Sequence, residues 1–224
     1  MKINYLLLNL GRCSRHSLIR RLGFSTLVFA SCITFAQDDS GAAAEAEISE
    51  IESVISALTT ARGEFEQIIR EQDGYVLDRQ TGSFALERPR KLHWQISELD
   101  QLLIGDGEQL YLYDELFEQV IIREWSSDPS LNPAAILLED IRLQDWARVE
   151  TAGNNLKLIP TGDIAAILEI ELSMSQGFPT MLTLLDTTGQ TTEIRFSEVE
   201  QNVELEPELF RFDIPSGVEV IYEE

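Results

Sequence analysis

Residues that could do acid–base, nucleophilic or metal chemistry are few in this chain of 224 residues. Its two histidines are His16 and His93, and its two cysteines are Cys13 and Cys32. Only His93 lies outside the first 36 residues, so a Ser-His-Asp triad or a zinc site would depend on it. His93 alternates with the apolar residues beside it, and we expect it at the surface or rim of a strand.

Acidic residues are abundant, with 39 Asp and Glu in total. A pair of them could act as the acid and base of a glycosidase. With this many acids, however, pairs at any spacing occur by chance, and a solvated acidic surface explains them equally well. The chain has no phosphate-binding loop, dinucleotide fingerprint or calcium-loop pattern. We therefore expect no catalytic residues, no metal site and no cofactor.

The first 36 residues are typical of an export signal. They hold no acid and five basic residues: Lys2, Arg12, Arg15, Arg20 and Arg21. Residues 22–36 form an apolar run that is short for a membrane span, and residues 34–36 are a small-x-small cleavage site. We expect a signal peptide over residues 1–36 and a single domain over residues 37–224.

Two other interpretations of the N-terminal segment stay open. Residues 29–32 form a poor lipoprotein box, but a lipid attached to Cys32 would anchor the protein to a membrane. Residues 20–21 form a weak twin-arginine signal. Cleavage after Ala36 would remove both cysteines, so the mature chain would have neither a disulfide nor a thiolate.

The net charge is strongly negative, at −22 for the whole chain. Removing the signal leaves 12 basic and 39 acidic residues, a net charge of −27. Such a surface repels nucleic acid and anionic membranes. We expect no nucleic-acid partner, and solubility alone accounts for most of the charge.

Hydrophobic periodicity predicts one long helix over residues 46–60 after a loose terminus at 37–46. Its apolar stripe consists of Ile48, Ile51, Ile55 and Leu58. Residues 62–63, Arg-Gly, are expected to end this helix.

Most of the remaining chain has the period of two that is typical of strands, with a turn predicted at residues 80–82. Asn132 as N-cap and Pro133 at the first helical position predict a short helix over 134–139, with a second near 143–146. Strands are expected from residue 64 onward, at 83–87, 91–96, 102–104, 110–113, 120–122, 147–151, 155–159, 164–172, 180–186 and 191–199. This spacing predicts one antiparallel sheet, curved and unclosed, with helices lying over it.

A basic cluster, Arg88-Pro89-Arg90-Lys91, lies between two apolar stretches of the predicted sheet. Proline is tolerated in a sheet mainly at an edge or a break, which places Arg88 at a rim. An arginine there offers five donors in a planar fork. A solvated arginine at a strand end is the simpler explanation.

Several motifs follow one another in a fixed order from about residue 48 to the end. They are Phe65-x-Gln67, Gly82-x-Phe84-x-x-x-Arg88-Pro89-x-x-x-x-Trp94, Asp106-Gly107-x-x-Leu110-Tyr111-x-Tyr113, Glu118-Gln119-Val120, Asn132-Pro133 and Phe210-x-Phe212-x-x-Pro215-x-Gly217-Val218. In this order and spacing they resemble the LolA family of periplasmic outer-membrane lipoprotein carriers.

The resemblance implies a mainly β fold: an unclosed antiparallel β half-barrel with a helical lid covering a hydrophobic cavity. It implies a soluble, monomeric periplasmic chaperone that binds the acyl chains of lipoproteins and hydrolyses nothing. Such carriers take acylated lipoproteins from an ATP-driven exporter in the inner membrane and deliver them to a receptor lipoprotein at the outer membrane. The alternatives are a paralogue serving another lipid or glycolipid, a receptor-type relative anchored through Cys32, and an enzyme of the envelope.

The resemblance also implies residue roles. Arg88 is implied to be a latch that donates hydrogen bonds to backbone carbonyls of the lid. Acyl-chain-binding positions are implied at Ile55, Leu92, Trp94, Ile136, Leu137, Tyr111 and Tyr113. Core packing explains the first five equally well, and the two tyrosines could line the cavity or cover the outside. Arg90 and Lys91 depart from the family pattern and are either rim charges facing an acidic partner or solubilising residues.

Overall fold

The computed structural model describes residues 39–223, except 98, 130–131 and 163–166. The expected signal peptide therefore lies outside the described residues. The helical elements are α1 (Asp39–Ser56), α2 (Ala135–Leu138) and the single turns η1 (Leu143–Asp145) and η2 (Pro207–Phe210). The strands are β1 (Thr60–Arg70), β2 (Val76–Glu87), β3 (Lys91–Ile96), β4 (Gln101–Asp106), β5 (Gln109–Asp114), β6 (Gln119–Glu124), β7 (Ala147–Ala152), β8 (Asn155–Pro160), β9 (Ile167–Ser175), β10 (Phe178–Asp186), β11 (Thr191–Gln201) and β12 (Glu219–Glu223).

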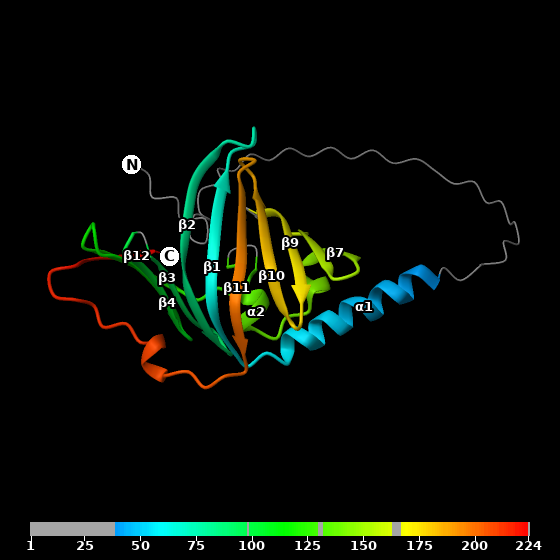
Figure 1. The fold of residues 1–224 in the computed structure, drawn as a ribbon, viewed down its shortest axis with the longest axis horizontal. Coiled ribbons are helices and arrows are strands. Elements are labelled where there is room, and N and C mark those ends of the chain that lie inside the picture. The colour runs from blue at the N-terminus through cyan, green and yellow to red at the C-terminus, as the bar shows by residue number, and fades with distance from the viewer. Residues whose placement is uncertain (1–38, 98, 130–131, 163–166, 224) are drawn as a thin grey trace, which may run out of the picture.

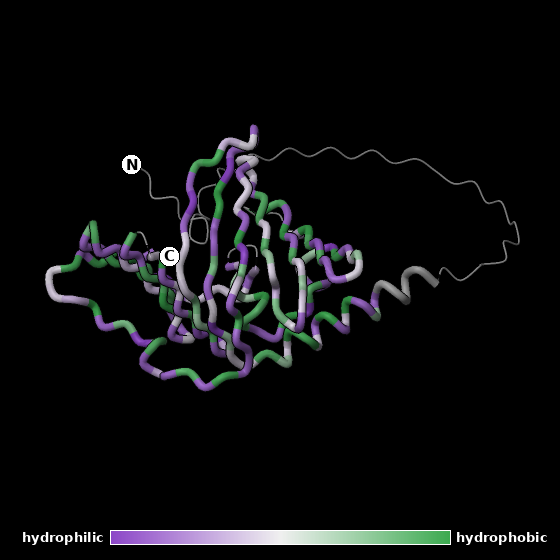
Figure 2. The backbone as a smooth tube through the Cα atoms, in the orientation of Figure 1, coloured by the Kyte–Doolittle hydropathy of each residue, from purple (hydrophilic) through white to green (hydrophobic). Residues whose placement is uncertain are grey.

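All the strands belong to one curved sheet in the order β12-β6-β5-β4-β3-β2-β1-β11-β10-β9-β8-β7. Successive strands pair antiparallel from β1 to β6 and from β7 to β11, and the antiparallel β1–β11 pair joins the two halves. The edge strands β12 and β7 do not pair with each other, and α2 lies against the concave face (Figure 1). Apolar and polar residues alternate along the strands (Figure 2). The predicted unclosed antiparallel sheet is confirmed, with one exception at β12.

The strand β12 was not predicted, and it pairs in parallel with β6. The chain reaches this edge after crossing the outer face of the sheet. There Phe210 packs with Ala85, and Phe212 packs against Tyr111 and Tyr113 with ring centroids 5.6 and 5.4 Å apart. A parallel pair needs a long crossover, and a local alternation pattern does not show where such a crossover ends.

The predicted bounds of α1 are wrong at both ends. The helix already begins at Asp39 and ends at Ser56, and the predicted stop at residues 62–63 lies inside β1. A Cβ on Gly63 would stand 2.8 Å from the carbonyl oxygen of Ser197 in β11. The glycine therefore permits a close approach between neighbouring strands and does not end a helix.

The turn predicted at residues 80–82 is also wrong, because β2 runs without interruption through these positions. A Cβ on Gly82 would lie 1.9 Å from the carbonyl oxygen of Gln95 and 2.7 Å from Phe65 Cζ. Because Gly82 has no side chain, the Phe65 ring crosses it and stacks on Trp94 with centroids 3.8 Å apart.

The predicted N-cap role of Asn132 is wrong as well. Its backbone carbonyl accepts from the amide of Ala135, while its side-chain amide donates to the carbonyl of Ser126 at 3.1 Å. The N-cap residue is Ala134, which makes no side-chain capping bond. Asn132 is buried and ties the loop after β6 to the start of α2.

We expect Gly82→Ala to lower the free energy of unfolding by about 1–3 kcal/mol, because the added methyl group overpacks the core. Urea unfolding of the purified protein measures this loss. Gly162→Ala is the matched control, since nothing lies within 4 Å of a Cβ there. Equal stability of the two variants would contradict the close packing inferred at Gly82.

His93 should make the free energy of unfolding depend on pH. It lies half-buried on the outer face, opposite Ala85 and Ile104, and burial lowers its pKa from the ordinary 6.5. Just below pH 6.5 the unfolded chain therefore binds more protons at His93 than the folded protein does. The stability that comes from keeping His93 neutral is fully present above pH 6.5 and is lost as the pH falls. We expect the free energy of unfolding of His93→Gln to fall less than that of the wild type between about pH 7.5 and 5.5. Parallel urea-derived profiles for the two proteins would show that the folded pKa is not lowered.

Candidate apolar ligand site

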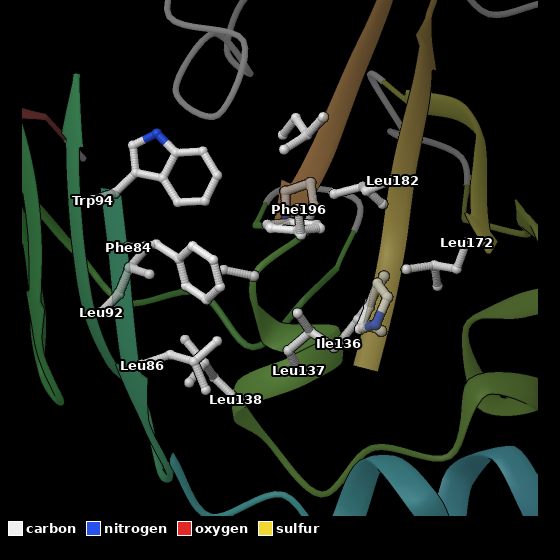
Figure 3. Close-up of a pocket in the computed structure, with 14 residues that line it drawn as sticks. Phe84, Leu86, Leu92, Trp94, Ile136, Leu137, Leu138, Leu172, Leu182 and Phe196 are labelled. Carbon is white, nitrogen blue, oxygen red and sulfur yellow. The ribbon is translucent and has the colours of Figure 1, made fainter. Parts of the chain in front are cut away.

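The concave face holds a cavity of about 50 Å³ lined only by apolar residues. Its walls come from both halves of the sheet, and α2 closes one side (Figure 3). The lining residues are Phe84, Leu86, Leu92, Trp94, Pro133, Ala134, Ile136, Leu137, Leu138, Leu172, Pro179, Leu182, Ile194 and Phe196. A site without polar groups recognises a ligand by its apolar surface alone.

Strand pairing places one wall of this cavity. Phe84 lies opposite Trp94, and Leu86 lies opposite Leu92, in the β2–β3 pair. Residues two apart on a strand share a face, so these four side chains form one apolar surface. Leu182 on β10 and Phe196 on β11 project toward this surface from the other half of the sheet (Figure 3).

The helix α2 fills the cavity with its own side chains. Ile136 and Leu138 are almost fully buried, and Leu137 packs against the same core. All three point in among the sheet residues (Figure 3). The short helix is therefore a plug, and the empty space that it leaves is far smaller than a long acyl chain.

The structure brings together four of the residues named from the sequence: Leu92, Trp94, Ile136 and Leu137. Ile55 is buried but is not among the cavity-lining residues. Tyr111 and Tyr113 lie on the opposite face against Phe212, and burial together with a hydrogen bond to Asp106 raises the pKa of Tyr111. The geometry thus assigns the tyrosines to the outside covering.

Sequence reasoning missed all the lining residues of the opposite wall, on β9, β10 and β11, together with some on β2 and around α2. The missed lining residues are Phe84, Leu86, Pro133, Ala134, Leu138, Leu172, Pro179, Leu182, Ile194 and Phe196. Alternation with Trp94 and Leu92 could have indicated Phe84 and Leu86. No local signal shows which distant strands curve round to face them.

Arg88 connects the sheet to the helical elements. Its Nη1 donates to the backbone carbonyl of Ile55 at the end of α1, at 2.9 Å. Its Nη2 pairs with the carboxylate of Asp140, which follows α2, and its backbone amide donates to the carbonyl of Thr59. The latch prediction requires bonds to backbone carbonyls of the lid. The carbonyl that the Arg88 side chain bonds belongs to α1, and the contact after α2 is with the Asp140 side chain.

The neighbouring basic residues have partners within the protein. Arg90 Nε lies 3.0 Å from Glu139 Oε1, and Lys91 pairs with Glu87 and lies 5.7 Å from the centre of the Phe210 ring. Both side chains therefore have acidic partners within the protein, whichever of the two expected roles they serve.

Within the described part of the chain, no three His, Cys, Asp or Glu side chains are grouped in a way that could hold a metal ion. Over the same residues, no helix is both long and apolar enough to cross a bilayer. His93 lies on the outer face, away from the cavity lining.

The fold and the site define a class of protein: a curved open sheet whose apolar cavity is covered on one side by a helical plug. The family model described as "Outer membrane lipoprotein carrier protein LolA" matches residues 56–213, so this chain belongs to the LolA family.

Curated relatives with the name "Outer-membrane lipoprotein carrier protein" cover most of the chain. The one from Halorhodospira halophila is 31% identical over 176 residues, covering 78% of this chain and 85% of the relative. The one from Pseudomonas paraeruginosa is 30% identical over 212 residues, covering 92% and 99%. A solved LolA superfamily protein from Nitrosomonas europaea aligns with a TM-score of 0.47 and 10% identity, covering 75% of this chain and 97% of that one.

We expect Ile136→Ala to cost about 2–5 kcal/mol of stability, because it empties part of a buried plug. It should also raise the affinity for the neutral apolar dye Nile red, since the cavity becomes larger. Leu116→Ala, at a side chain that is 74% exposed, should change stability by no more than about 0.5 kcal/mol. Urea unfolding and dye titration measure both effects, and equal results for the two variants would show that α2 does not plug the cavity.

Proposed function

We propose that this protein carries lipoproteins through the periplasm by enclosing their acyl chains between the curved sheet and the helices. The observation that carries the proposal is the wholly apolar cavity closed by an apolar helical plug. The names of the relatives and the family match support the same conclusion. No catalytic step is proposed.

The proposed binding follows from the energetics of acyl chains in water. Each CH₂ group removed from water contributes about 0.8 kcal/mol, so even one chain needs an extensive apolar surface. The closed cavity of about 50 Å³ is too small, and α2 must move out before cargo can enter. Cargo then replaces contacts that Ile136, Leu137 and Leu138 make in the empty protein.

This exchange keeps binding reversible. When cargo leaves, the plug returns and covers the sheet again, so the apolar surface is never left in water. A carrier that only held cargo tightly could not release it. We propose that Arg88 favours the closed state as a latch, with hydrogen bonds of roughly 1–3 kcal/mol each that are weak enough to break.

We further propose a signal peptide at residues 1–36 and a carrier domain at residues 37–224. The partners would be acylated lipoproteins, an ATP-driven exporter in the inner membrane and a receptor lipoprotein at the outer membrane, and the carrier would be a monomer. The mature charge of −27 supports a protein that does not adhere to either anionic membrane surface. Nothing in the relatives' names favours a receptor anchored through Cys32, which lies outside the described residues.

The test is native mass spectrometry of the exported protein purified from an envelope extract, alongside Arg88→Leu. We expect an acylated lipoprotein bound to both forms, with a larger bound fraction and impaired hand-off in the variant, because the latch that favours the empty closed state is lost. Arg148→Leu is the matched control, since the Arg148 side chain is 65% exposed and pairs with Glu150 on its own strand.

Two results would count against this account. Free fatty acid or glycolipid in place of lipoprotein would assign the cavity to another lipid pathway. Equal bound fractions for Arg88→Leu and Arg148→Leu would remove the latch role while leaving the carrier role intact.

A further inference from the structure

Glu139, the residue directly after α2, is the most heavily bonded carboxylate near the cavity. Its side chain is only 11% exposed. Oε1 accepts from the indole Nε1 of Trp125 and from Ser127 Oγ at 2.7 Å, and it lies 3.0 Å from Arg90 Nε. A buried carboxylate is stable only with such partners, and loss of one leaves a costly unpaired charge.

The neighbouring carboxylate, Asp140, has a different environment. It is 85% exposed and pairs with Arg88, and an ion pair with one partner so exposed to solvent contributes little to stability. The better shielded contact of Arg88 is its bond to the Ile55 carbonyl. Arg88 is therefore bonded more firmly to α1 than to α2.

The backbone reinforces the contact between Arg90 and α2. The Arg90 amide donates to the Leu138 carbonyl at 3.2 Å, so main chain and side chain both hold the end of the helix. Gly105 makes room for this arrangement, because a Cβ there would lie 3.0 Å from the Trp125 ring and 3.2 Å from the Arg90 carbonyl. Residues of the loop after β6 and of the β2–β3 turn thus converge on one carboxylate.

We infer that the lid has two separately held parts: Arg88 holds α1, whereas Glu139, bound by Arg90, Trp125 and Ser127, positions α2 in the cavity. Glu139 is a positioning residue whose loss frees the plug while α1 stays docked. The inference rests on the proposed carrier function for its purpose, since a two-part lid allows the cavity to open without detachment of α1.

The experiment compares Glu139→Gln, Asp140→Asn and Arg88→Leu in the purified protein, without cargo. Asp140→Asn is the matched control, because it makes the same chemical change one residue away. Hydrogen–deuterium exchange is followed at the bonded amides of α2, Leu138 and Glu139, and at those ending α1, Ala57 and Leu58. Nile red titration measures access to the cavity, and urea unfolding confirms that each variant is folded.

We expect Glu139→Gln to speed exchange in α2 by about tenfold or more, the effect of losing one charged hydrogen bond, and to strengthen Nile red binding with α1 unchanged. Arg88→Leu should speed exchange at Ala57 and Leu58 more than exchange in α2, and Asp140→Asn should alter neither. Equal effects of the two acid substitutions on α2, or faster α2 exchange only in Arg88→Leu, would overturn the inference.

A second measurement separates positioning from general destabilisation. In an Arg90→Gln background, Glu139→Gln should produce less than half of its single-variant change in α2 exchange, because the shared contact is already gone. Additive changes would overturn the direct link between the two residues. None of these readouts uses a lipoprotein, so failure to find cargo in an envelope extract leaves them unaffected.

Discussion

The described residues form an open sheet of twelve strands, and its concave apolar face and a smaller apolar patch on its outer face must both be kept from water. This constraint organises the molecule. On the concave face, Phe84, Trp94 and Phe196 form a surface that only an apolar partner can cover. The plug α2 provides that cover inside. On the outer face, the C-terminal segment places Phe210 and Phe212 over the sheet before β12 extends its edge.

The two coverings differ in how firmly they are attached. The C-terminal segment continues into a strand that pairs with β6, so its removal would break a ladder of backbone hydrogen bonds. The plug is one turn of helix and makes no sheet pairing. Its attachment consists of apolar contacts in the cavity and of polar contacts at the β2–β3 turn, around Arg88 and Arg90. The plug α2, which the proposed mechanism requires to open, is therefore the covering that has no ladder of backbone hydrogen bonds to the sheet.

Apolar contact and polar contact have separate tasks in this design. Burial of Ile136 and Leu138 supplies stability without direction, because dispersion and the hydrophobic effect are not directional. Hydrogen bonds to Glu139 and to the Ile55 carbonyl are directional, and they hold the ends of α2 and α1 at fixed positions on the sheet. An acyl chain can substitute for the first kind of contact and cannot substitute for the second. In the mechanism that we propose, cargo replaces the plug without reproducing the contacts that mark the closed state.

The sequence by itself determined the strand-rich class, most strand positions and the short helix near residue 135, because periods of two and 3.6 are local properties. It also indicated Leu92, Trp94, Ile136 and Leu137, which the tertiary structure gathers in one cavity. Local patterns misassigned Gly63 and Gly82, since a glycine required for a close crossing looks the same as one in a turn. Only the tertiary structure decided that Tyr111 faces outward, that β12 joins β6 and that Glu139 meets Arg90. These outcomes depend on sheet curvature and on contacts between distant segments, which no local period encodes.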